Sequence, residues 1–238
     1  MADERVLKKG RWVPQVHQWL DTLLARSPGV ICLDWDETCA AGDIGEALMD
    51  YLDPSGGALR AYEAELARGD VLKAYVESLY ILAGRSVEEV SRVCSEAVVW
   101  AIEAGRVEQR PEMKNLMKVA DSLGWEVWVV TASATPLVQA FSALYDHPSD
   151  RVIGMDLRQK DGWVLPELES VATYRQGKVD AIVQRIGKPV DLAVGDTLTD
   201  LEMLISAKNG LVIGPRHPLL AEEALARGWA IQPLFESA

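Results

Sequence analysis

The segment at residues 30–38, with the sequence VICLDWDET, constrains the fold more than any other stretch of the chain. Four apolar residues precede two aspartates, Asp34 and Asp36, that are separated by a single residue. A short apolar run that ends in polar residues is typical of a buried strand. In an open α/β sheet, ligands bind at the carboxyl ends of the strands, so both acids are expected in a crevice. A divalent metal ion would relieve the repulsion between two such carboxylates.

Strand patterns alternate with helix patterns along most of the chain. Apolar runs at residues 126–130, 190–194 and 210–214 are expected strands, and segments of helical periodicity lie between them. This alternation predicts an α/β protein with a doubly wound, mainly parallel sheet. The Asp-Gly pair at residues 161–162 lies between two extended runs, which predicts a β-hairpin.

The stretch between the first two expected strands has a different pattern. From about residue 42 to about residue 110, apolar residues recur at helical spacing and no part alternates like a strand. Turn sequences at residues 53–57 and 83–86 divide this stretch into at least three helices. We therefore expect an α/β core formed by residues 1–41 and 111–238, with an inserted all-helical cap formed by residues 42–110.

The composition excludes several classes of partner. The net charge of -12 over 238 residues argues against a nucleic acid, since proteins that bind the phosphate backbone carry a basic face. No apolar run is long enough to span a membrane, and the first ten residues lack the apolar region of a signal peptide. We expect a cytoplasmic protein without a membrane partner, and no pattern predicts an oligomeric state. The three cysteines lack metal-ligand spacing and are interpreted as small buried apolar residues.

Further polar residues are expected at the same edge of the sheet as the first two aspartates. Thr131 and Ser133 follow the second strand, Asp196 and Asp200 follow a later strand, and Lys178 opens a helix. Taken singly, each of these residues is more often a helix cap or a turn residue. Together they predict one site, because no structural need places four acids, a hydroxyl and a lysine around one apolar sheet.

In this order, the motifs resemble those of the haloacid dehalogenase (HAD) superfamily of phosphohydrolases. The resemblance rests on DWDET at residues 34–38, Thr131, GKVD at residues 177–180 and GDTLTD at residues 195–200. It spans roughly residues 30–214, and the helical insertion, the Gly-Lys pair and the hairpin are most similar to the phosphoserine phosphatase branch. It implies a Rossmann-like core with a cap, a small phosphate ester as substrate, and Mg²⁺ as cofactor.

The resemblance also implies a role for each acid. Asp34 would be the nucleophile that forms an aspartyl-phosphate, and Asp36 would be the general acid and then the general base. Asp34, the backbone carbonyl of Asp36, and Asp196 would hold the metal, with Asp200 orienting metal-bound water.

The same resemblance assigns the phosphoryl oxygens to Thr131, Ser133 and Lys178. A helix cap is an equal alternative for Ser133, because the phosphoserine phosphatase branch usually has glycine near this position.

The cap sequence gives some information about the leaving group. Asp43 and Glu46 are expected near the mouth of the cleft, and aromatic residues lie along the cap: Tyr51, Tyr62, Tyr75, Tyr80 and Trp100. Acids and aromatic rings together suit a cationic amine, so phosphocholine, phosphoethanolamine and phosphoserine are candidate substrates. The alternative is that these aromatic residues form the core of the cap and that the two acids belong to the first turn of a helix.

The sequence therefore predicts a Mg²⁺-dependent phosphomonoesterase. Asp36 favours phosphoryl transfer, because the dehalogenases that gave the superfamily its name lack this second acid. The alternatives are a phosphotransferase that uses the same intermediate and a catalytically silent binding or regulatory protein.

Overall fold

The computed structural model describes residues 5–235. Within these residues, six parallel strands form a central sheet in the order β10-β9-β8-β1-β4-β5. The predicted doubly wound parallel sheet is confirmed, with the expected first strand in the middle of the sheet. The strands are β1 (Val30–Leu33), β4 (Glu126–Ala134), β5 (Val152–Met155), β8 (Val190–Gly195), β9 (Gly210–Ile213) and β10 (Ala230–Gln232).

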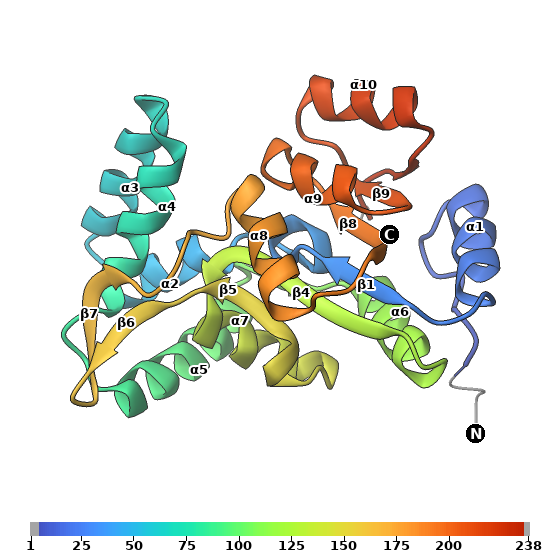
Figure 1. Cartoon of the computed structure of the whole chain (residues 1–238). Helices are drawn as coiled ribbons and strands as arrows, with labels where there is room; N and C mark the ends of the chain where they lie inside the picture. Colours follow the sequence, from blue (N-terminus) through green and yellow to red (C-terminus); the bar gives the residue numbers. More distant parts are fainter. Residues whose placement is uncertain (1–4, 236–238) are drawn as a thin grey trace.

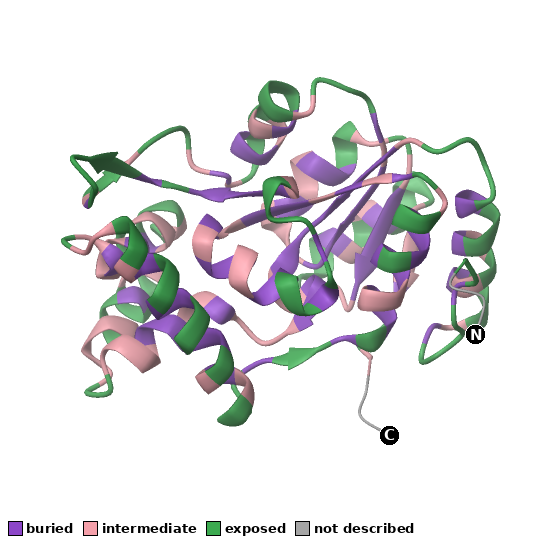
Figure 2. Ribbon diagram, turned by 90° about the horizontal axis from the view of Figure 1, so that it is seen from below, coloured by how far each residue is buried: buried purple, intermediate pink, exposed green. Residues whose placement is uncertain are grey.

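Helices cover both faces of the sheet (Figure 1). Alternate residues of β1 pack on opposite faces: Ile31 and Leu33 belong to one apolar cluster, and Val30 and Cys32 belong to the other. This explains why the strand is apolar throughout, and the strands are correspondingly buried in Figure 2. On the first face lie α1 (Pro14–Leu24), α6 (Pro111–Ser122) and α7 (Thr135–Ser142), and on the second lie α8 (Gln176–Arg185), α9 (Leu201–Ser206) and α10 (Pro218–Arg227).

The stretch expected to form the cap contains most of the remaining helices, but it is not entirely helical. Its last residues form a two-residue strand, β3 (Glu108–Gln109), which pairs antiparallel with β2 (Ala40–Ala41). Strand alternation cannot be recognised over two residues, and the pairing brings together residues that are far apart in the sequence. Its helices are α2 (Ile44–Leu52), α3 (Gly57–Ala67), α4 (Val71–Leu79), the short η2 (Tyr80–Leu82) and α5 (Val87–Glu103).

A hairpin from the core also contacts this helical segment. Strands β6 (Leu157–Lys160) and β7 (Trp163–Leu168) are antiparallel, which confirms the hairpin predicted from Asp-Gly. Backbone N–H groups of Gly84 and Val87 donate to the hairpin at 2.8 and 3.0 Å, and Val164 N–H donates back to the carbonyl of Arg85 at 2.9 Å. The helical segment is therefore attached to the core at the hairpin as well as at the β2–β3 pair.

Several shorter helices and the chain ends complete the description. The expected core begins at residue 1 and ends at residue 238, in segments (1–4 and 236–238) that lie outside the described residues.

All three cysteines are buried and unpaired, as expected. Among the described residues, none of the helices has the length and apolar character needed to cross a bilayer. The short helices of the core are η1 (Trp35–Cys39), η3 (Ala143–Tyr145), η4 (Ser149–Arg151) and η5 (Leu198–Asp200).

Candidate active site

Asp34 directly follows β1 at the carboxyl edge of the sheet. Its backbone N–H donates to the carbonyl of Val194 at 2.9 Å, which extends the strand pairing by one residue. The next residue, Trp35, is completely buried and packs edge-on against Phe141 and Tyr145, with ring centroids 5.3 and 5.0 Å away. The sheet on one side and a buried indole on the other thus fix the position of the first acid.

Lys178 connects two of the predicted acids. Its Nζ lies 2.6 Å from Asp34 Oδ1 and 2.6 Å from Asp200 Oδ1, and the whole residue is buried. Burial alone would lower the pKa of the ammonium group, but the carboxylates of Asp200 and Asp34 outweigh it and raise the pKa. The lysine is therefore cationic, and two of its three N–H donors are directed at carboxylates.

Three carboxylates form a group that fits a metal ion. One oxygen from each of Asp34, Asp196 and Asp200 lies within 4.8 Å of the others, and all three residues are buried. Asp196 Oδ2 has no hydrogen-bond partner among the described residues although it is inaccessible to solvent. A buried, unpartnered carboxylate oxygen in an all-oxygen group suits a hard cation such as Mg²⁺. The side chain of Asp36 lies outside this group, which is compatible with its expected role as a backbone ligand.

The pKa values reflect the excess of negative charge. Burial, and then the charge of Asp200, raise the pKa of Asp34 to about 7 in spite of Lys178. Burial and the neighbouring charges of Asp200 and Asp34 raise the pKa of Asp196 to about 9. Two such shifts in one cluster mark a site with too few cations of its own.

Asp36 connects the site to the helical segment. Its Oδ1 accepts the backbone N–H of Ile44 at 2.8 Å, and its Oδ2 accepts the hydroxyl of Ser133 at 2.6 Å. Burial, followed by the charge of Asp43, raises the pKa of Asp36 well above its ordinary value. A carboxyl group whose pKa is raised is suited to act as a general acid.

Ser133 contacts Asp36 and Thr131 contacts Ser133, but the backbone of both residues differs from expectation. The sequence places them after a strand, whereas β4 continues to Ala134. A shift in the β4–β5 register between Val130 and Ala134 releases these residues from the regular ladder while they remain extended. The Thr131 hydroxyl accepts the N–H of Ser133 at 3.0 Å.

Asp43 and Glu46 have a structural role and also line a cavity. Asp43 Oδ1 accepts the N–H of Glu46 at 2.9 Å and so caps α2, as one of the two interpretations predicts. Both acids also line a partly open pocket of about 20 Å³, together with Tyr62 and Tyr75. The rings of Tyr62 and Tyr75 lie 6.0 Å apart between centroids. About one water molecule fits in this space, so the pocket in this structure is smaller than a phosphate ester.

Of the other cap aromatic residues, two pair with each other. Tyr51 and Trp100 lie 5.7 Å apart between ring centroids. Both pack against the main apolar cluster, which is the one that contains Ile31 and Leu33. They agree with the interpretation of aromatic residues as cap core.

The sequence analysis missed several residues around this site. Arg110 is buried and donates to the carbonyls of Glu37 and Thr38, and it pairs with the Glu37 carboxylate at 3.3 Å. Arg216 pairs with the other oxygen of the same carboxylate. Arg216 follows an apolar strand in the same way as the predicted acids do, so the rule applied to them points to this residue too.

Comparisons with known proteins agree with the fold. A family model described as haloacid dehalogenase-like hydrolase matches residues 31–204. No curated protein matches the chain.

Several solved structures share the architecture. A Bordetella pertussis Tohama I protein of unknown function is 20% identical with a TM-score of 0.77, covering 87% of this chain and 98% of its own. A phosphoserine phosphohydrolase-like protein from Francisella tularensis subsp. tularensis SCHU S4 is 16% identical with a TM-score of 0.61, covering 86% and 94%. A phosphoserine phosphatase solved with bound substrate is 16% identical with a TM-score of 0.59, covering 83% and 91%. At these identities the likeness concerns the fold.

Proposed function

Because this chain belongs to the haloacid dehalogenase-like hydrolase family, we propose that it is a Mg²⁺-dependent phosphomonoesterase acting on a small phosphate ester. The observation that carries the proposal is the cluster of three buried carboxylates, Asp34, Asp196 and Asp200, in which Lys178 bridges Asp34 and Asp200. Such a cluster of negative charges would be strongly destabilising unless it binds a cation.

Asp34 is the nucleophile in this proposal. The ion pair with Lys178 at 2.6 Å favours the charged form of its carboxylate against the effect of burial. An oxygen of Asp34 attacks phosphorus, the bond from phosphorus to the alkoxide leaving group breaks, and an aspartyl-phosphate forms. Water then attacks the same phosphorus, which releases inorganic phosphate and restores the carboxylate.

Asp36 moves the proton in both steps. It is placed by Ile44 N–H and the Ser133 hydroxyl, and its raised pKa supports a protonated resting form. The carboxyl proton passes to the leaving alkoxide oxygen, and the resulting carboxylate takes a proton from the attacking water.

Thr131, Ser133 and Lys178 hold the transferred phosphoryl group. Lys178 contacts Asp34, Ser133 contacts Asp36, and Thr131 contacts Ser133. Their hydroxyl, backbone N–H and ammonium groups are donors for oxygens on which negative charge shifts during transfer. Asp34 and Asp196, with Asp200 beside them, would hold Mg²⁺, which supplies positive charge to the phosphoryl oxygens.

The leaving group is proposed to carry an amine. Asp43 and Glu46 provide negative charge and Tyr62 and Tyr75 provide aromatic faces around the pocket, which Ser133 also lines. These groups suit an ammonium or a quaternary amine, so phosphoethanolamine, phosphocholine and phosphoserine are the first substrates to test.

The experiment is to measure inorganic phosphate released from these three esters and from sugar phosphates, with Mg²⁺ and with excess chelator. We expect release that requires Mg²⁺ and falls by about 10⁴-fold in Asp34→Asn, in which the nucleophile is lost. Asp121→Asn is the control, because Asp121 is an exposed acid paired with Arg151 away from the site. Undiminished activity in Asp34→Asn would disprove the mechanism. Consumption of ester without phosphate release would indicate transfer to another hydroxyl group.

A further inference from the structure

Arg216 lies beside the metal-binding group but belongs to none of the recognised motifs. It follows β9, and its backbone N–H donates to the carbonyl of Asp196 at 3.3 Å. Its side-chain Nε is 3.7 Å from Asp196 Oδ2, the oxygen that accepts no hydrogen bond. Asp196 in turn belongs, together with Asp34, to the cluster of three carboxylates. One carboxylate thus separates the Arg216 guanidinium from the proposed nucleophile.

Glu37 holds this guanidinium in place. Its Oε1 pairs with Arg216 Nη2, while its Oε2 pairs with Arg110 Nη2 at 3.3 Å. The Glu37 backbone has a φ of 58°, a left-handed conformation that residues other than glycine rarely adopt. Arg110 also donates to the carbonyls of Glu37 and Thr38, which secures the strained turn. Arg216 is therefore anchored to a fixed carboxylate at the border of the site.

Three cationic side chains around the site, Lys178, Arg110 and Arg216, differ in their exposure and in the number of partners that they already have. Lys178 is 1% exposed and bridges two carboxylates. Arg110 is 6% exposed and is engaged by Glu37 and two backbone carbonyls. The side chain of Arg216 is 54% exposed, so its guanidinium can meet an entering ligand.

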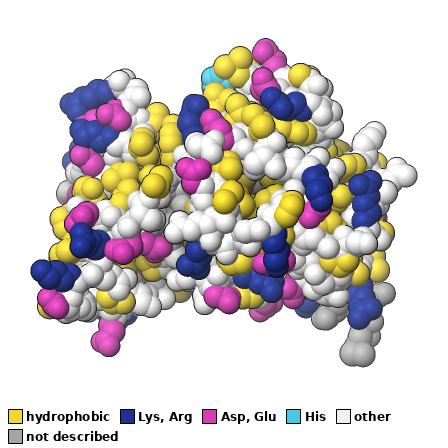
Figure 3. Space-filling model, in the orientation of Figure 1, with side chains coloured by type: hydrophobic (Ala, Val, Ile, Leu, Met, Phe, Trp, Pro, Cys, Tyr) yellow, Lys and Arg dark blue, Asp and Glu magenta, His cyan; other side chains and the backbone are white. Residues whose placement is uncertain are grey.

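The approach to the site is otherwise dominated by acids. Asp43 and Glu46 line the pocket next to the site, and Asp196 and Asp34 lie in the site itself. In the orientation of Figure 3, the surface is hollowed between the lobe of α3 and α4 and the lobe of α9 and α10. A dianion is repelled by this environment unless a cation is present at the entrance.

We propose that Arg216 is a further substrate-binding residue, which Glu37 holds beside Asp196 and which contacts the anionic phosphate group. This inference rests on the proposed phosphatase function and adds a residue to it. A guanidinium suits this task because it offers paired donors that match the geometry of phosphate oxygens.

The position of Arg216 gives its removal two effects of opposite sign. Loss of a contact to phosphate weakens anion binding. Loss of a positive charge next to Asp196 strengthens the binding of Mg²⁺, because cation and guanidinium repel each other. A residue that only supports the fold would weaken both kinds of binding together.

The test is calorimetric titration of the full chain with Mg²⁺ alone, and then with inorganic phosphate in the presence of Mg²⁺. For Arg216→Gln we expect about tenfold weaker phosphate binding, as for a lost charge-assisted hydrogen bond. We expect about threefold tighter Mg²⁺ binding in the same variant. Arg216→Lys keeps the charge and should retain most of the phosphate affinity.

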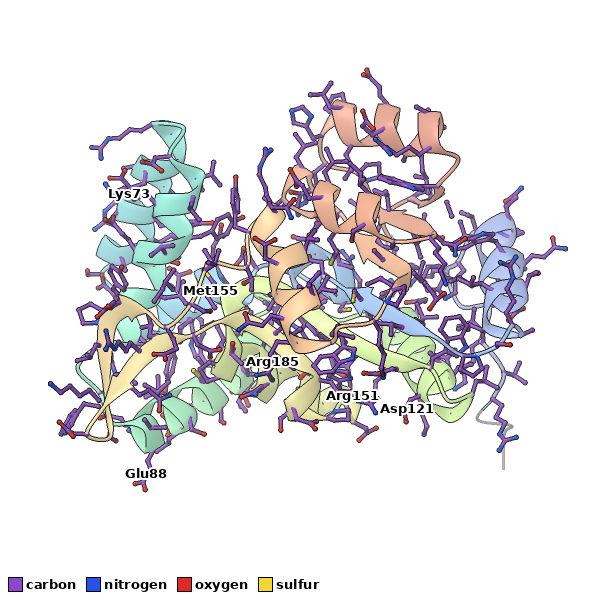
Figure 4. All side chains as sticks on the ribbon, viewed as in Figure 1. Lys73, Glu88, Asp121, Arg151, Met155 and Arg185 are labelled. Atoms are coloured by element: carbon purple, nitrogen blue, oxygen red, sulfur yellow. The ribbon has the colours of Figure 1, made fainter. Side chains whose placement is uncertain are left out.

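Arg151→Gln is the matched control. Arg151 pairs with one carboxylate, Asp121, at 3.2 Å near the start of β5, away from the carboxyl edge (Figure 4). It should leave both affinities unchanged. Unchanged phosphate affinity in Arg216→Gln, or equal weakening of both affinities without recovery in Arg216→Lys, would overturn the inference alone. Failure of the wild-type protein to bind phosphate in Mg²⁺ would overturn the proposed function together with it.

Discussion

The hydroxyl of Thr173 donates a 2.5 Å hydrogen bond to the backbone carbonyl of Thr131. Both residues are almost completely buried, so water cannot take the place of either partner. The bond connects the loop that precedes α8, the helix of Lys178, to the part of β4 that leaves the regular ladder. It therefore couples the positions of the proposed phosphate-binding threonine and lysine.

Replacing Thr173 with valine should destabilise the protein by about 1–3 kcal/mol, because the Thr131 carbonyl would stay buried without a donor. Urea unfolding at constant m-value measures this change. Thr173→Ser keeps the hydroxyl and should recover most of the loss. Equal stability of the valine and serine variants would show that the hydrogen bond has no net effect.

Lys178→Met should have a larger effect. The substitution leaves Asp34 and Asp200 buried and close together without their shared cation, which is expected to reduce stability by about 3–5 kcal/mol. The measurement is urea unfolding in excess chelator at pH 7, so that no metal replaces the ammonium group. Lys188→Met, at an exposed ion pair with Glu126, is the control and should change stability little. A loss below about 1 kcal/mol for Lys178→Met would contradict the prediction.

The charge on Asp43 should affect selectivity between substrates. Asp43→Asn keeps a side chain that caps α2 but removes the charge that faces the cavity. We expect kcat/KM for amine esters to fall about tenfold relative to a neutral ester such as glycerol phosphate. Asp70→Asn makes the same change at the N-cap of α4, outside the cavity lining, and should leave the ratio unchanged. An unaltered ratio in Asp43→Asn would leave Asp43 with its capping role alone.

The pair of Arg11 and Glu112 should make stability depend on pH. Arg11 Nε and Nη2 donate to the two Glu112 oxygens at 3.0 and 2.8 Å, and this hydrogen bonding is the main cause that lowers the pKa of Glu112. A carboxylate whose pKa is lowered on folding adds stability above its unfolded pKa, about 4.3, and this contribution disappears as pH falls through the folded pKa.

Glu112→Gln should therefore reduce stability by about 1 kcal/mol at pH 7, a moderate value because Arg11 is 37% exposed and partly screened. The difference from wild type should shrink as the pH is lowered below about 4.3. Thermal unfolding between pH 3 and pH 7 measures this difference in stability. The exposed pair of Glu223 and Arg227 is the control, and its removal should change stability very little at any pH in this range. A difference that grows toward low pH would have the wrong sign.

Much of the fold was predictable because its signals are local. The apolar run before Asp34, the Asp-Gly pair of the hairpin and the helical periodicity of the inserted segment each depend on residues that are close in sequence. The convergence of Asp34, Lys178 and Asp200 was also predictable, because parallel strands bring their carboxyl ends to one edge.

Other features depend on contacts that the sequence does not encode locally. The contact of Glu37 with Arg110 and Arg216 joins three distant segments, and no spacing rule relates their positions. Thr173 donates to a backbone carbonyl, and because every residue has a backbone carbonyl, the residue type of the partner does not indicate this hydrogen bond. The extension of β4 through Thr131 depends on a register shift against β5, which is set by the partner strand.

The two attachments of the helical segment restrict how a substrate can enter. A segment joined to the core only at β2 and β3 could rotate as a rigid body about that strand pair. Here the hairpin also holds residues 84–87 by backbone hydrogen bonds, and α5 packs into the main apolar cluster. The helices α3 and α4 contribute Tyr62 and Ala74 to a small cluster with Met49, and Leu79 at the end of α4 belongs to the main apolar cluster. The helical segment is therefore held to the core at two separate places, and it cannot turn about the β2–β3 pair without breaking the hydrogen bonds to the hairpin.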